Sequence, residues 1–535
     1  MIFNINTMLN EQNSGIEHAE LQREQVLRQA KIPFKQVYLQ QNLQLHRWTK
    51  LYGLADDEVI DLYDYYQDRL NEPEKHVTVD QIKLTDQPVE RVFDQEAQFY
   101  LDRNPNNGTI WGRIRLFPGT NRVRILERFD GFGNLYRCDL YDWRGFLSYS
   151  QFYNPDNQVT HYTWFNKIGQ PVITWVLAPR NQKHTQPIDS IILIDRHGHR
   201  RVYENEAQLM AGFLDDLNSD YYQEQRPNIF VTDRTARTEF AMGDLNLPAV
   251  KVFHLHNDHR SGMTNDPHSL MNNNYEYNFY NLQQFDFVIT ATEKQRRDVI
   301  QRFKLDSDHV VRIPVGLVKP VDRVTMNKRV PHSVLATCRV AEEKRVDWMV
   351  EAIALAMKEV PDIYLDVYGY LDHRHHDGAK KKIDAIVKKY PEVEKHFKLH
   401  GYQKSLDSER DQHQIYLVAS TMEGFNIALM EAQNHGEVGL TVDVDYGPNE
   451  LVQDKVNGLI VKDPKDFAKQ LVKLFKQPEQ LQSMSDKAYE LSHRYDSQHI
   501  AKQWRQLLAT AQCDWDALPM HYKKNWQTAG LEEEI

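Results

Sequence analysis

The chain has 535 residues, a hydrophobic content of 41% and a formal net charge of −11 at pH 7. Its length predicts two or three domains, and its negative charge argues against general nucleic-acid binding, which favours basic surfaces. The three cysteines, Cys138, Cys338 and Cys513, form no C-x-x-C pair. They therefore indicate neither a disulfide framework nor a zinc site, and they fit a reducing cytoplasm. The first residues lack the features of a signal peptide, and no apolar stretch approaches the ~20 residues that span a bilayer.

The first residues predict how the N-terminal domain begins. Met1–Asn6 reads as a strand, and a turn through Ser14 and Gly15 leads into an amphipathic helix that ends near Gln29. A strand, a glycine turn and a helix open a Rossmann-like domain, and a glycine lets the backbone approach a ligand. An ordinary serine N-cap explains the turn equally well, and the single glycine departs from the G-x-G-x-x-G of dinucleotide sites. We expect residues 1–76 to form the first part of this domain.

Residues 77–187 differ from the flanking segments in composition and in the frequency of turn signals. Turn signals such as Asp130-Gly131-Phe132-Gly133-Asn134 recur between aromatic and β-branched segments, which predicts a meander of antiparallel hairpins. We expect an inserted β-domain that binds a partner or an extended acceptor molecule, although aromatic residues in a sheet are more often part of the core. The side chains behind this expectation are four of the nine tryptophans (Trp111, Trp143, Trp164, Trp175) and five arginines (Arg113, Arg115, Arg122, Arg124, Arg128).

The α/β pattern resumes in residues 188–320, the expected second part of the N-terminal domain. Apolar runs predict strands at 190–194, 228–233, 250–253 and 286–290. The third of these strands leads into a cluster of His254, His256 and His259. An H-x-H pattern can indicate a metal site, but beyond Asp258 no acidic or cysteine residue completes an obvious ligand set. We expect no metal here.

A linker with Pro and Lys leads to the expected second domain, residues 321–496, and then to residues 497–535. Five apolar runs predict its strands, at 333–338, 364–369, 397–401, 414–419 and 439–443. Arg339 and Lys344 follow the first of them, and two cations at a strand end suit a diphosphate. A solvated charge run is the alternative explanation. In residues 497–535 we expect a C-terminal helix that packs back on the N-terminal domain.

Ser420–Ala432 is the most informative stretch of the second domain. It follows the fourth predicted strand, turns at Ser and Gly residues, and continues as a helix. Such a junction directs free backbone N–H groups and the positive end of a helix dipole at a bound group, which favours a diphosphate. Glu423 lies in the turn and Glu431 about two helical turns further on, so the two carboxylates can reach different hydroxyl groups of one polar ligand. Taken alone, this spacing is common and is more typical of a solvated helix face.

Glu423 and Glu431, with Gly424 and Phe425 after the first, resemble the E-x7-E signature of retaining nucleotide-sugar glycosyltransferases of family 4. The resemblance implies the GT-B fold, in which two Rossmann-like α/β domains face a cleft, here with an antiparallel β-meander inserted in the N-terminal domain. It implies that Glu423 lies beside the donor sugar and that Glu431 binds the ribose of the nucleotide. Gly424, Phe425 and Asn426 of the turn would also contact the donor.

The resemblance implies roles for residues of other loops as well. Arg339 and Lys344 match the pair that holds the pyrophosphate and stabilises the leaving UDP. The loop of Ser14 and Gly15 matches the one that approaches the donor phosphate and the acceptor, and Tyr402 stands where a nucleobase commonly stacks.

A histidine near the donor sugar or acceptor is also implied, for which His256 is our first choice and His259 the second. His254 and Glu450 are further possible contacts, the latter because the family often has an acidic residue after a Gly-Pro turn at this place. We expect Glu423, His256, Arg339 and Lys344 to be the catalytic residues.

Phe3-Asn4-Ile5-Asn6, Ser14–Ala19, the β-insert and the whole length resemble the catalytic glycosyltransferases of the accessory Sec system. The resemblance implies transfer of GlcNAc, or glucose, from a UDP-sugar to Ser/Thr hydroxyls of a serine-rich repeat adhesin before export. It also implies a partner, a related non-catalytic subunit that binds the substrate. Two alternatives remain: a teichoic-acid α-glycosyltransferase acting on poly(polyol-phosphate), and a non-enzymatic adaptor of the same fold. The intact Arg339, Lys344, Glu423 and Glu431 argue against the adaptor.

The resemblance further implies a retaining mechanism, in which the acceptor attacks from the face that UDP leaves and the departing phosphate takes the proton. Protein groups then mainly stabilise charge and orient the reactants. We expect no cofactor beyond the donor substrate, UDP-GlcNAc or UDP-glucose. We also expect a cytoplasmic protein that can lie at the inner face of the cell membrane.

Overall fold

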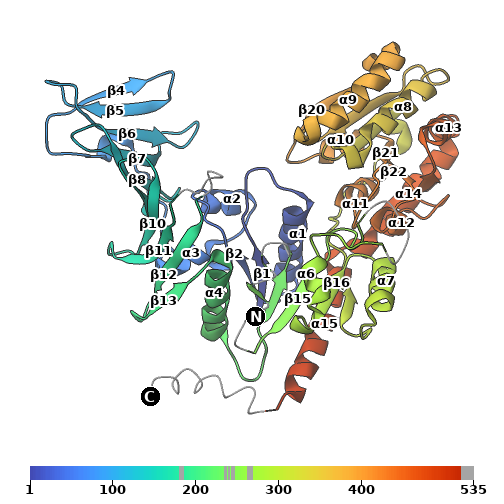
Figure 1. Cartoon of the computed structure of the whole chain (residues 1–535). Helices are drawn as coiled ribbons and strands as arrows, with labels where there is room; N and C mark the ends of the chain where they lie inside the picture. The colour runs from blue at the N-terminus through green and yellow to red at the C-terminus, as the bar shows by residue number, and fades with distance from the viewer. Residues whose placement is uncertain (180–185, 234–237, 239–240, 243–247, 262–268, 520–535) are drawn as a thin grey trace. The chain divides into compact units, whose positions relative to one another are not determined.

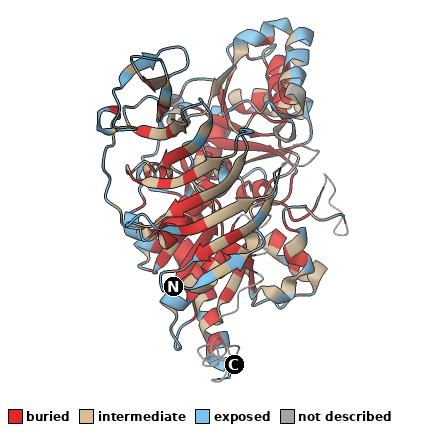
Figure 2. Cartoon of the chain, turned by 60° about the vertical axis from the view of Figure 1, so that its left-hand side comes forward, coloured by how far each residue is buried: buried red, intermediate tan, exposed pale blue. Residues whose placement is uncertain are grey.

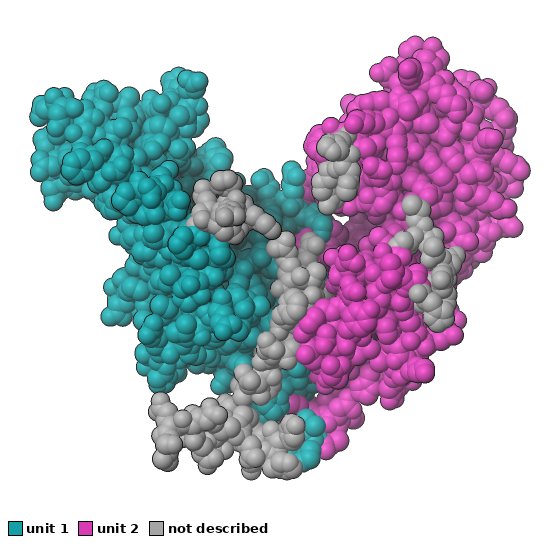
Figure 3. Space-filling model, viewed as in Figure 1, with its two compact units in different colours: residues 1–14, 34–251, 518–535 teal, residues 15–33, 252–517 magenta. Residues whose placement is uncertain are grey.

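The computed structural model describes residues 1–179, 186–233, 238, 241–242, 248–261 and 269–519. The chain forms two compact units, which Figure 3 shows in different colours. Unit 1 consists of residues 1–14, 34–251 and 518–535, and unit 2 of residues 15–33 and 252–517. Figure 1 labels the helices and strands of both units.

The first sheet has seven strands in the order β17-β16-β15-β14-β1-β2-β3. Strand β1 pairs in parallel with β2 and β14, and β16 pairs in parallel with β15 and β17. The order reverses between β1 and β14, so the carboxyl ends of these two strands form a topological switch point, where doubly wound sheets bind ligands. The strands are β1 (Ile2–Asn6), β2 (Phe34–Tyr38), β3 (Val59–Asp61), β14 (Ile229–Thr232), β15 (Val250–His254), β16 (Phe287–Thr290) and β17 (Val310–Arg312).

A ten-stranded antiparallel sheet in unit 1 follows the chain without any crossover, from β4 to β13. Loops of four to six residues join successive strands from β4 to β11 and β12 to β13, as the recurring Asn, Asp and Gly signals predict. The strands are β4 (Glu90–Asp94), β5 (Phe99–Arg103), β6 (Ile110–Leu116), β7 (Val123–Phe129), β8 (Leu135–Tyr141), β9 (Leu147–Tyr153), β10 (Val159–Phe165), β11 (Pro171–Leu177), β12 (Ile188–Ile194) and β13 (Arg200–Tyr203).

The meander extends further along the chain than we expected. The prediction that residues 190–194 return to the parallel sheet is wrong, because β12 pairs antiparallel with β11, with Trp175 opposite Ile191. Residues 200–203 then form β13, the last strand of the meander. The apolar sequence of β12 suggested a strand of the parallel sheet. In the structure its side chains alternate between buried and more exposed positions, as in a half-covered antiparallel strand.

Aromatic residues of the meander pack against the α/β part of unit 1. The Trp164 ring is buried and stacks on Tyr63 at 4.8 Å and on Tyr149 at 5.0 Å between ring centroids. The guanidinium groups of Arg122 and Arg47 lie over the Trp143 ring, with their carbon atoms 3.9 and 4.5 Å from its centroid. These two tryptophans therefore contribute to packing inside unit 1.

A buried charge network joins the meander to the helices of unit 1. On α2, His46 contacts Asp64 through Nε2 (3.0 Å) and Asp56 through Nδ1 (3.3 Å). Arg144, from the turn between β8 and β9, contacts Asp64 at 2.5 Å and Asp142 at 2.8 Å. Burial disfavours the imidazolium, but the hydrogen bonds to Asp56 and Asp64 outweigh it and raise the pKa of His46 to about 9.

The third sheet, in unit 2, has six strands in the order β20-β19-β18-β21-β22-β23, and every neighbouring pair is parallel. In chain order this is 3-2-1-4-5-6, the strand order of a doubly wound nucleotide-binding domain. Its switch point lies between β18 and β21. The strands are β18 (Ser333–Thr337), β19 (Tyr364–Tyr368), β20 (Phe397–Gly401), β21 (Ile415–Val418), β22 (Val438–Val442) and β23 (Gly458–Val461).

Helices cover the sheets. Unit 1 contains α2 (Leu45–Leu51), α3 (Leu62–Tyr66) and α4 (Glu206–Tyr221). Unit 2 contains α1 (Gly15–Gln29), α6 (Glu276–Tyr280), α7 (Glu293–Phe303), α8 (Val346–Ala356), α9 (Arg374–Lys389), α10 (Asp407–Gln412), α11 (Ile427–Asn434), α12 (Gly447–Leu451), α13 (Pro464–Phe475), α14 (Pro478–Ser492) and α15 (Ser497–Ala517). Short 3-10 helices lie at Asp56–Glu58, Val79–Gln81, Leu282–Gln284, Met326–Lys328, Glu342–Lys344, Pro391–His396 and His493–Tyr495.

The last helix, α15, packs against α1 and β17. Arg23 of α1 lies over the buried Trp504 ring at 5.8 Å, and Arg505 donates to the carbonyl of Ala30 at 3.2 Å. Figure 2 shows buried residues along the strands, and β21 and β22 are buried at every position. Within the described part of the chain, every helix is too short or too polar to cross a membrane.

Candidate active site

The predicted donor residues lie at the switch point of the six-stranded sheet. Arg339 and Lys344 follow β18, and the turn from Ser420 to Asn426 follows β21. Because the carboxyl ends of these two adjacent strands share one edge of the sheet, the two loops meet. The amide of Thr421 donates to the carbonyl of Glu343 at 2.8 Å.

Lys344 and Glu423 form an ion pair between these two loops. The Lys344 ammonium lies 2.7 Å from Oε1 of Glu423, whose residue is 9% exposed. Burial disfavours the ammonium, but the Glu423 carboxylate outweighs this effect and raises the pKa of Lys344. The site therefore keeps a lysine cation beside the glutamate that the E-x7-E pattern singled out.

The turn after Glu423 is held tightly by backbone contacts. A Cβ on Gly424 would lie 2.1 Å from the carbonyl oxygen of His256, so only glycine lets the two segments approach this closely. The Phe425 ring is buried and lies edge-on to Tyr495. Asn426 caps α11, because its side chain accepts a hydrogen bond from the amide of Leu429 at 2.9 Å.

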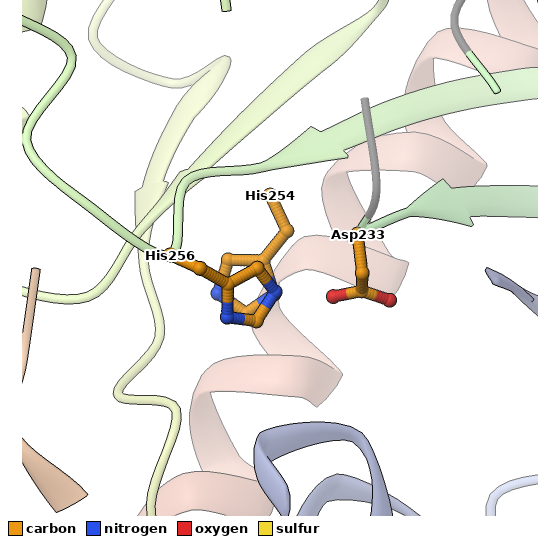
Figure 4. Close-up of side chains that lie close together, drawn as sticks. All are labelled: Asp233, His254 and His256. Carbon is orange, nitrogen blue, oxygen red and sulfur yellow. The ribbon is translucent and has the colours of Figure 1, made fainter. Parts of the chain in front are cut away.

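The three predicted histidines follow or end β15 and have different surroundings. The Arg23 guanidinium donates to Nδ1 of the buried His254 at 3.3 Å. The rings of His254 and His256 have centroids 4.4 Å apart and appear together in Figure 4, which also labels Asp233, the residue after β14 in unit 1. Of the two, His256 is the more exposed.

His259 has a different environment from His256. It is 1% exposed, and its ring is stacked 6.0 Å from that of Tyr446. Burial, together with Arg260 and Arg302, lowers the pKa of His259 to about 3. His259 is therefore neutral near pH 7 and packs as an aromatic ring, which leaves His256 as the better candidate for contact with a substrate.

Arg339 stands at the open end of β18, with its side chain about one-third exposed. Its guanidinium pairs with Glu343 and lies 3.4 Å from Asp372. These carboxylates orient the guanidinium group and leave it partly exposed. A bound diphosphate would meet the Arg339 guanidinium and the Lys344 ammonium on the same loop.

Glu431 is held by two residues that the sequence pattern does not reveal. Its carboxylate accepts from Nε2 of Gln22 on α1 at 3.1 Å and pairs with Arg410 on α10. Gln22 also accepts a hydrogen bond from the amide of Leu317 at 2.6 Å. Since a carboxylate has about four acceptor positions, Glu431 retains capacity for ribose hydroxyl groups. Burial lowers the pKa of His18 on α1, and the opposing effect of the Glu431 carboxylate, which raises this pKa, is smaller.

The remaining predicted residues lie at the margin of this arrangement. Glu450 accepts from the amide of Glu293 at 2.8 Å and from Nε of Arg312 at 3.1 Å, which directs its carboxylate to the start of α7 and the end of β17. Tyr402 follows β20 and is partly buried. Gly15 begins α1, where a Cβ would meet nothing within 4 Å, and Ser14 precedes it in unit 1.

The arrangement can bind an anion and two separate groups of hydroxyls. Arg339, Lys344 and the N-terminal end of α11 offer positive charge and hydrogen-bond donors for a diphosphate. Glu423 and Glu431 offer acceptors on either side. This is the set of contacts that a nucleoside diphosphate joined to a sugar requires.

Comparison with known proteins agrees with this chemistry. A family model described as "Glycosyl transferases group 1" matches residues 331–477. A UDP-N-acetylglucosamine–peptide N-acetylglucosaminyltransferase GtfA subunit of Streptococcus gordonii is 27% identical and covers 96% of this chain and 99% of its own length. A poly(glycerol-phosphate) alpha-glucosyltransferase of Bacillus subtilis is 24% identical over 72% of this chain and 54% of its own length.

Solved structures show the same fold. The pneumococcal O-GlcNAc transferase GtfA, in complex with UDP and GlcNAc, superposes with a TM-score of 0.79 at 23% identity, over 95% of this chain and 98% of its own. A chain of a GtfA/B complex gives a TM-score of 0.80 at 25% identity, over 96% of this chain and 100% of its own. The prediction of a GT-B fold is confirmed.

Proposed function

Because the chain is a GtfA-like glycosyltransferase of the GT-B fold, we propose that it transfers N-acetylglucosamine from UDP-N-acetylglucosamine to serine and threonine hydroxyls of a protein. UDP-glucose is the alternative donor. The proposed acceptor is a serine-rich repeat adhesin, modified before its export by the accessory Sec system. The relatives that cover nearly the whole chain carry names of this activity, which supports the proposal.

The observation that carries the proposal is the Lys344–Glu423 pair at the switch point of the six-stranded sheet. It combines a cation for the diphosphate with a carboxylate for the sugar. The same turn lies against the carbonyl of His256, which brings the histidine loop to the sugar end of the site. An adaptor without catalysis would not need this combination.

In the proposed reaction the bond between the anomeric carbon and the β-phosphate oxygen breaks, and the acceptor oxygen bonds to the same face of the sugar. The acceptor proton passes to the departing phosphate. Lys344 and Arg339 neutralise the charge that develops on the diphosphate, while Glu431 holds the ribose and Glu423 orients the sugar. We propose that two protein cations suffice for this step and that it needs no metal, so activity should survive treatment with EDTA.

We further propose that the enzyme works with a related, non-catalytic glycosyltransferase-like subunit that binds the acceptor. The GtfA/B complex among the structures of the same fold supports this part of the proposal. We propose a cytoplasmic location, peripheral at the inner face of the membrane, since the acceptor is modified before export.

The wall-polymer alternative requires a basic surface for a polyanionic acceptor. Four of the five arginines that suggested such a surface on the insert are paired with carboxylates. Arg113 and Arg115 share Glu127 at 2.8 and 3.0 Å. Arg122 pairs with Glu74 and Arg128 with Asp139. This charge compensation weakens the case for a teichoic-acid acceptor.

UDP release measured against two acceptors tests the proposal. The wild-type protein and Glu423→Gln are each given UDP-GlcNAc or UDP-glucose, with a Ser/Thr-rich peptide or with poly(glycerol-phosphate), in the presence of the partner subunit. We expect UDP release with the peptide and UDP-GlcNAc, and its loss in Glu423→Gln. Release that depends on poly(glycerol-phosphate) instead would replace the proposal with the wall-polymer function.

A further inference from the structure

Asp445, on the loop after β22, is a buried carboxylate that two cations share. It is 7% exposed, and its Oδ2 accepts from the Arg260 guanidinium at 3.1 Å and from the Lys294 ammonium. Arg260 is itself 3% exposed and fixed by two hydrogen bonds to Asp258, at 3.0 and 2.9 Å. The cations come from the loop after β15 and from α7, so Asp445 ties the six-stranded domain to elements of the first sheet.

Glu450 makes a second tie of the same kind five residues later. Its Oε1 accepts from Nε of Arg312, at the end of β17, at 3.1 Å. Its Oε2 accepts from the amide of Glu293 at the first position of α7, where a carboxylate also meets the positive end of the helix dipole. Asp445 on the loop and Glu450 on α12, which follows the loop directly, therefore both bind the β15–β17 region.

The backbone of this loop supports the turn that carries Glu423. The amide of Tyr446 donates to the carbonyl of Glu423 at 3.0 Å. A Cβ on Gly447 would lie 1.7 Å from the carbonyl oxygen of Phe425, so the loop passes directly against the turn. On its other side the turn touches the carbonyl of His256 through Gly424. The Glu423 turn is thus enclosed between the His256 loop and the Asp445 loop.

The aromatic ring of Tyr446 completes the enclosure. It is fully buried and stacked with His259 at 6.0 Å, and the cations of Arg260 and Lys294 lie 4.8 and 5.4 Å from its centroid. The two cations that bind the Asp445 carboxylate thus also contact its neighbour's ring. The side chains of Asp445 and Tyr446 bind the same two cations, and the Tyr446 amide binds the Glu423 carbonyl, so side-chain and backbone contacts fix the same loop.

We propose that Asp445 and Glu450 are positioning residues, an ionic clasp that holds Glu423 in place beside His256 for sugar transfer. The proposal rests on the proposed use of a UDP-sugar donor, but it does not depend on the identity of the acceptor. It also gives Glu450 a different role from the ligand contact that the sequence suggested. Because the clasp acts on the geometry of Glu423, it affects the rate of transfer more than the binding of UDP by Lys344, Arg339 and Glu431.

Kinetics of UDP-sugar hydrolysis without any acceptor test the clasp. Asp445→Asn removes the charge with little change in shape, and Asp445→Glu keeps the charge. Asp443→Asn is the matched control, because Asp443 is an exposed carboxylate on the same loop whose described hydrogen bond is to Asn449. For each variant, kcat, KM for the UDP-sugar, UDP affinity and Tm are measured.

We expect Asp445→Asn to lower kcat on the order of 100-fold, the scale of a misplacement of about 1 Å, with KM and UDP affinity within a few fold of wild type. Glu450→Gln should act in the same direction, Asp445→Glu should recover part of the rate, and Asp443→Asn should be unchanged. An unchanged kcat in Asp445→Asn would overturn the proposal. So would a loss of UDP affinity in parallel with kcat, or a fall of Tm below the assay temperature in both Asp445 variants. A wild-type protein that hydrolyses UDP-sugars but modifies no peptide would contradict the proposed acceptor and leave the clasp standing.

Discussion

Lys344 and Glu423 form the ion pair on which the proposed diphosphate site depends. Each is partly removed from water, and each carries a charge that the other compensates at 2.7 Å. Bound UDP would bring two further negative charges to a loop that already holds Lys344 and Arg339. In the proposed site the lysine would therefore contact both the diphosphate and Glu423.

Replacing Lys344 with Met should therefore have two effects. UDP affinity and the rate of UDP release should both fall, the rate by roughly 100-fold or more, because charge on the leaving group loses its stabilising partner. Isothermal titration with UDP and a coupled assay of UDP release measure these effects. Lys358→Met, which changes an exposed lysine, is the control. Wild-type UDP affinity in Lys344→Met would contradict the assignment of this residue to the diphosphate.

Gly424→Ala tests the close approach of the Glu423 turn to the His256 loop. The added methyl group would lie 2.1 Å from the His256 carbonyl oxygen, so one of the two backbone segments must move. We expect the rate of UDP release to fall on the order of 100-fold. Gly131→Ala, where a Cβ meets nothing within 4 Å, should keep the wild-type rate. Equal activity of both variants would show that the contact has no role in transfer.

At the scale of elements, buried parallel strands are the part of the fold that the sequence predicts well. The runs at β18, β21 and β22 are mostly apolar because helices cover both faces of that sheet. Strand β12 has a similar apolar run but belongs to the meander. The sequence of one strand does not show which strands it pairs with, so the prediction placed β12 in the wrong sheet. Gln22 and Arg410 also escaped prediction, because they reach Glu431 from 409 and 21 positions away.

The attachment of the meander to α2 and α3 gives a prediction for the pH dependence of stability. The pKa of His46 is raised from 6.5 to about 9 in the folded protein. Its contribution is therefore fully present below pH 6.5 and is lost as the pH rises through 9, with a magnitude of up to about 3 kcal/mol. We expect Tm to fall between pH 6.5 and 9.5 more steeply in wild type than in His46→Gln.

Scanning calorimetry of three proteins over this pH range measures the effect. His197→Gln changes an exposed histidine and should follow the wild-type curve. Parallel curves for wild type and His46→Gln would show that His46 does not carry the predicted charge.

The whole molecule combines α/β parts built on two parallel sheets with one long antiparallel meander. Arg339, Lys344 and Glu423 lie at the switch point of the six-stranded sheet, and the meander in unit 1 is a separate ten-stranded antiparallel sheet. Arg339, Lys344, Glu423 and Glu431 could be singled out in the sequence because they stand in short spans around strand ends, and their role in donor binding stays a prediction. The acceptor could be inferred only from resemblance, since no short pattern in the meander encodes it.

The most direct test of the central claim is intact-mass analysis of a Ser/Thr-rich peptide after incubation with UDP-GlcNAc, the partner subunit and this protein. We predict that the peptide gains whole N-acetylhexosamine units on serine or threonine and that Glu423→Gln abolishes the gain. A peptide of unchanged mass, under conditions in which the wild-type protein binds UDP and the partner is present, would contradict the proposed protein glycosyltransferase.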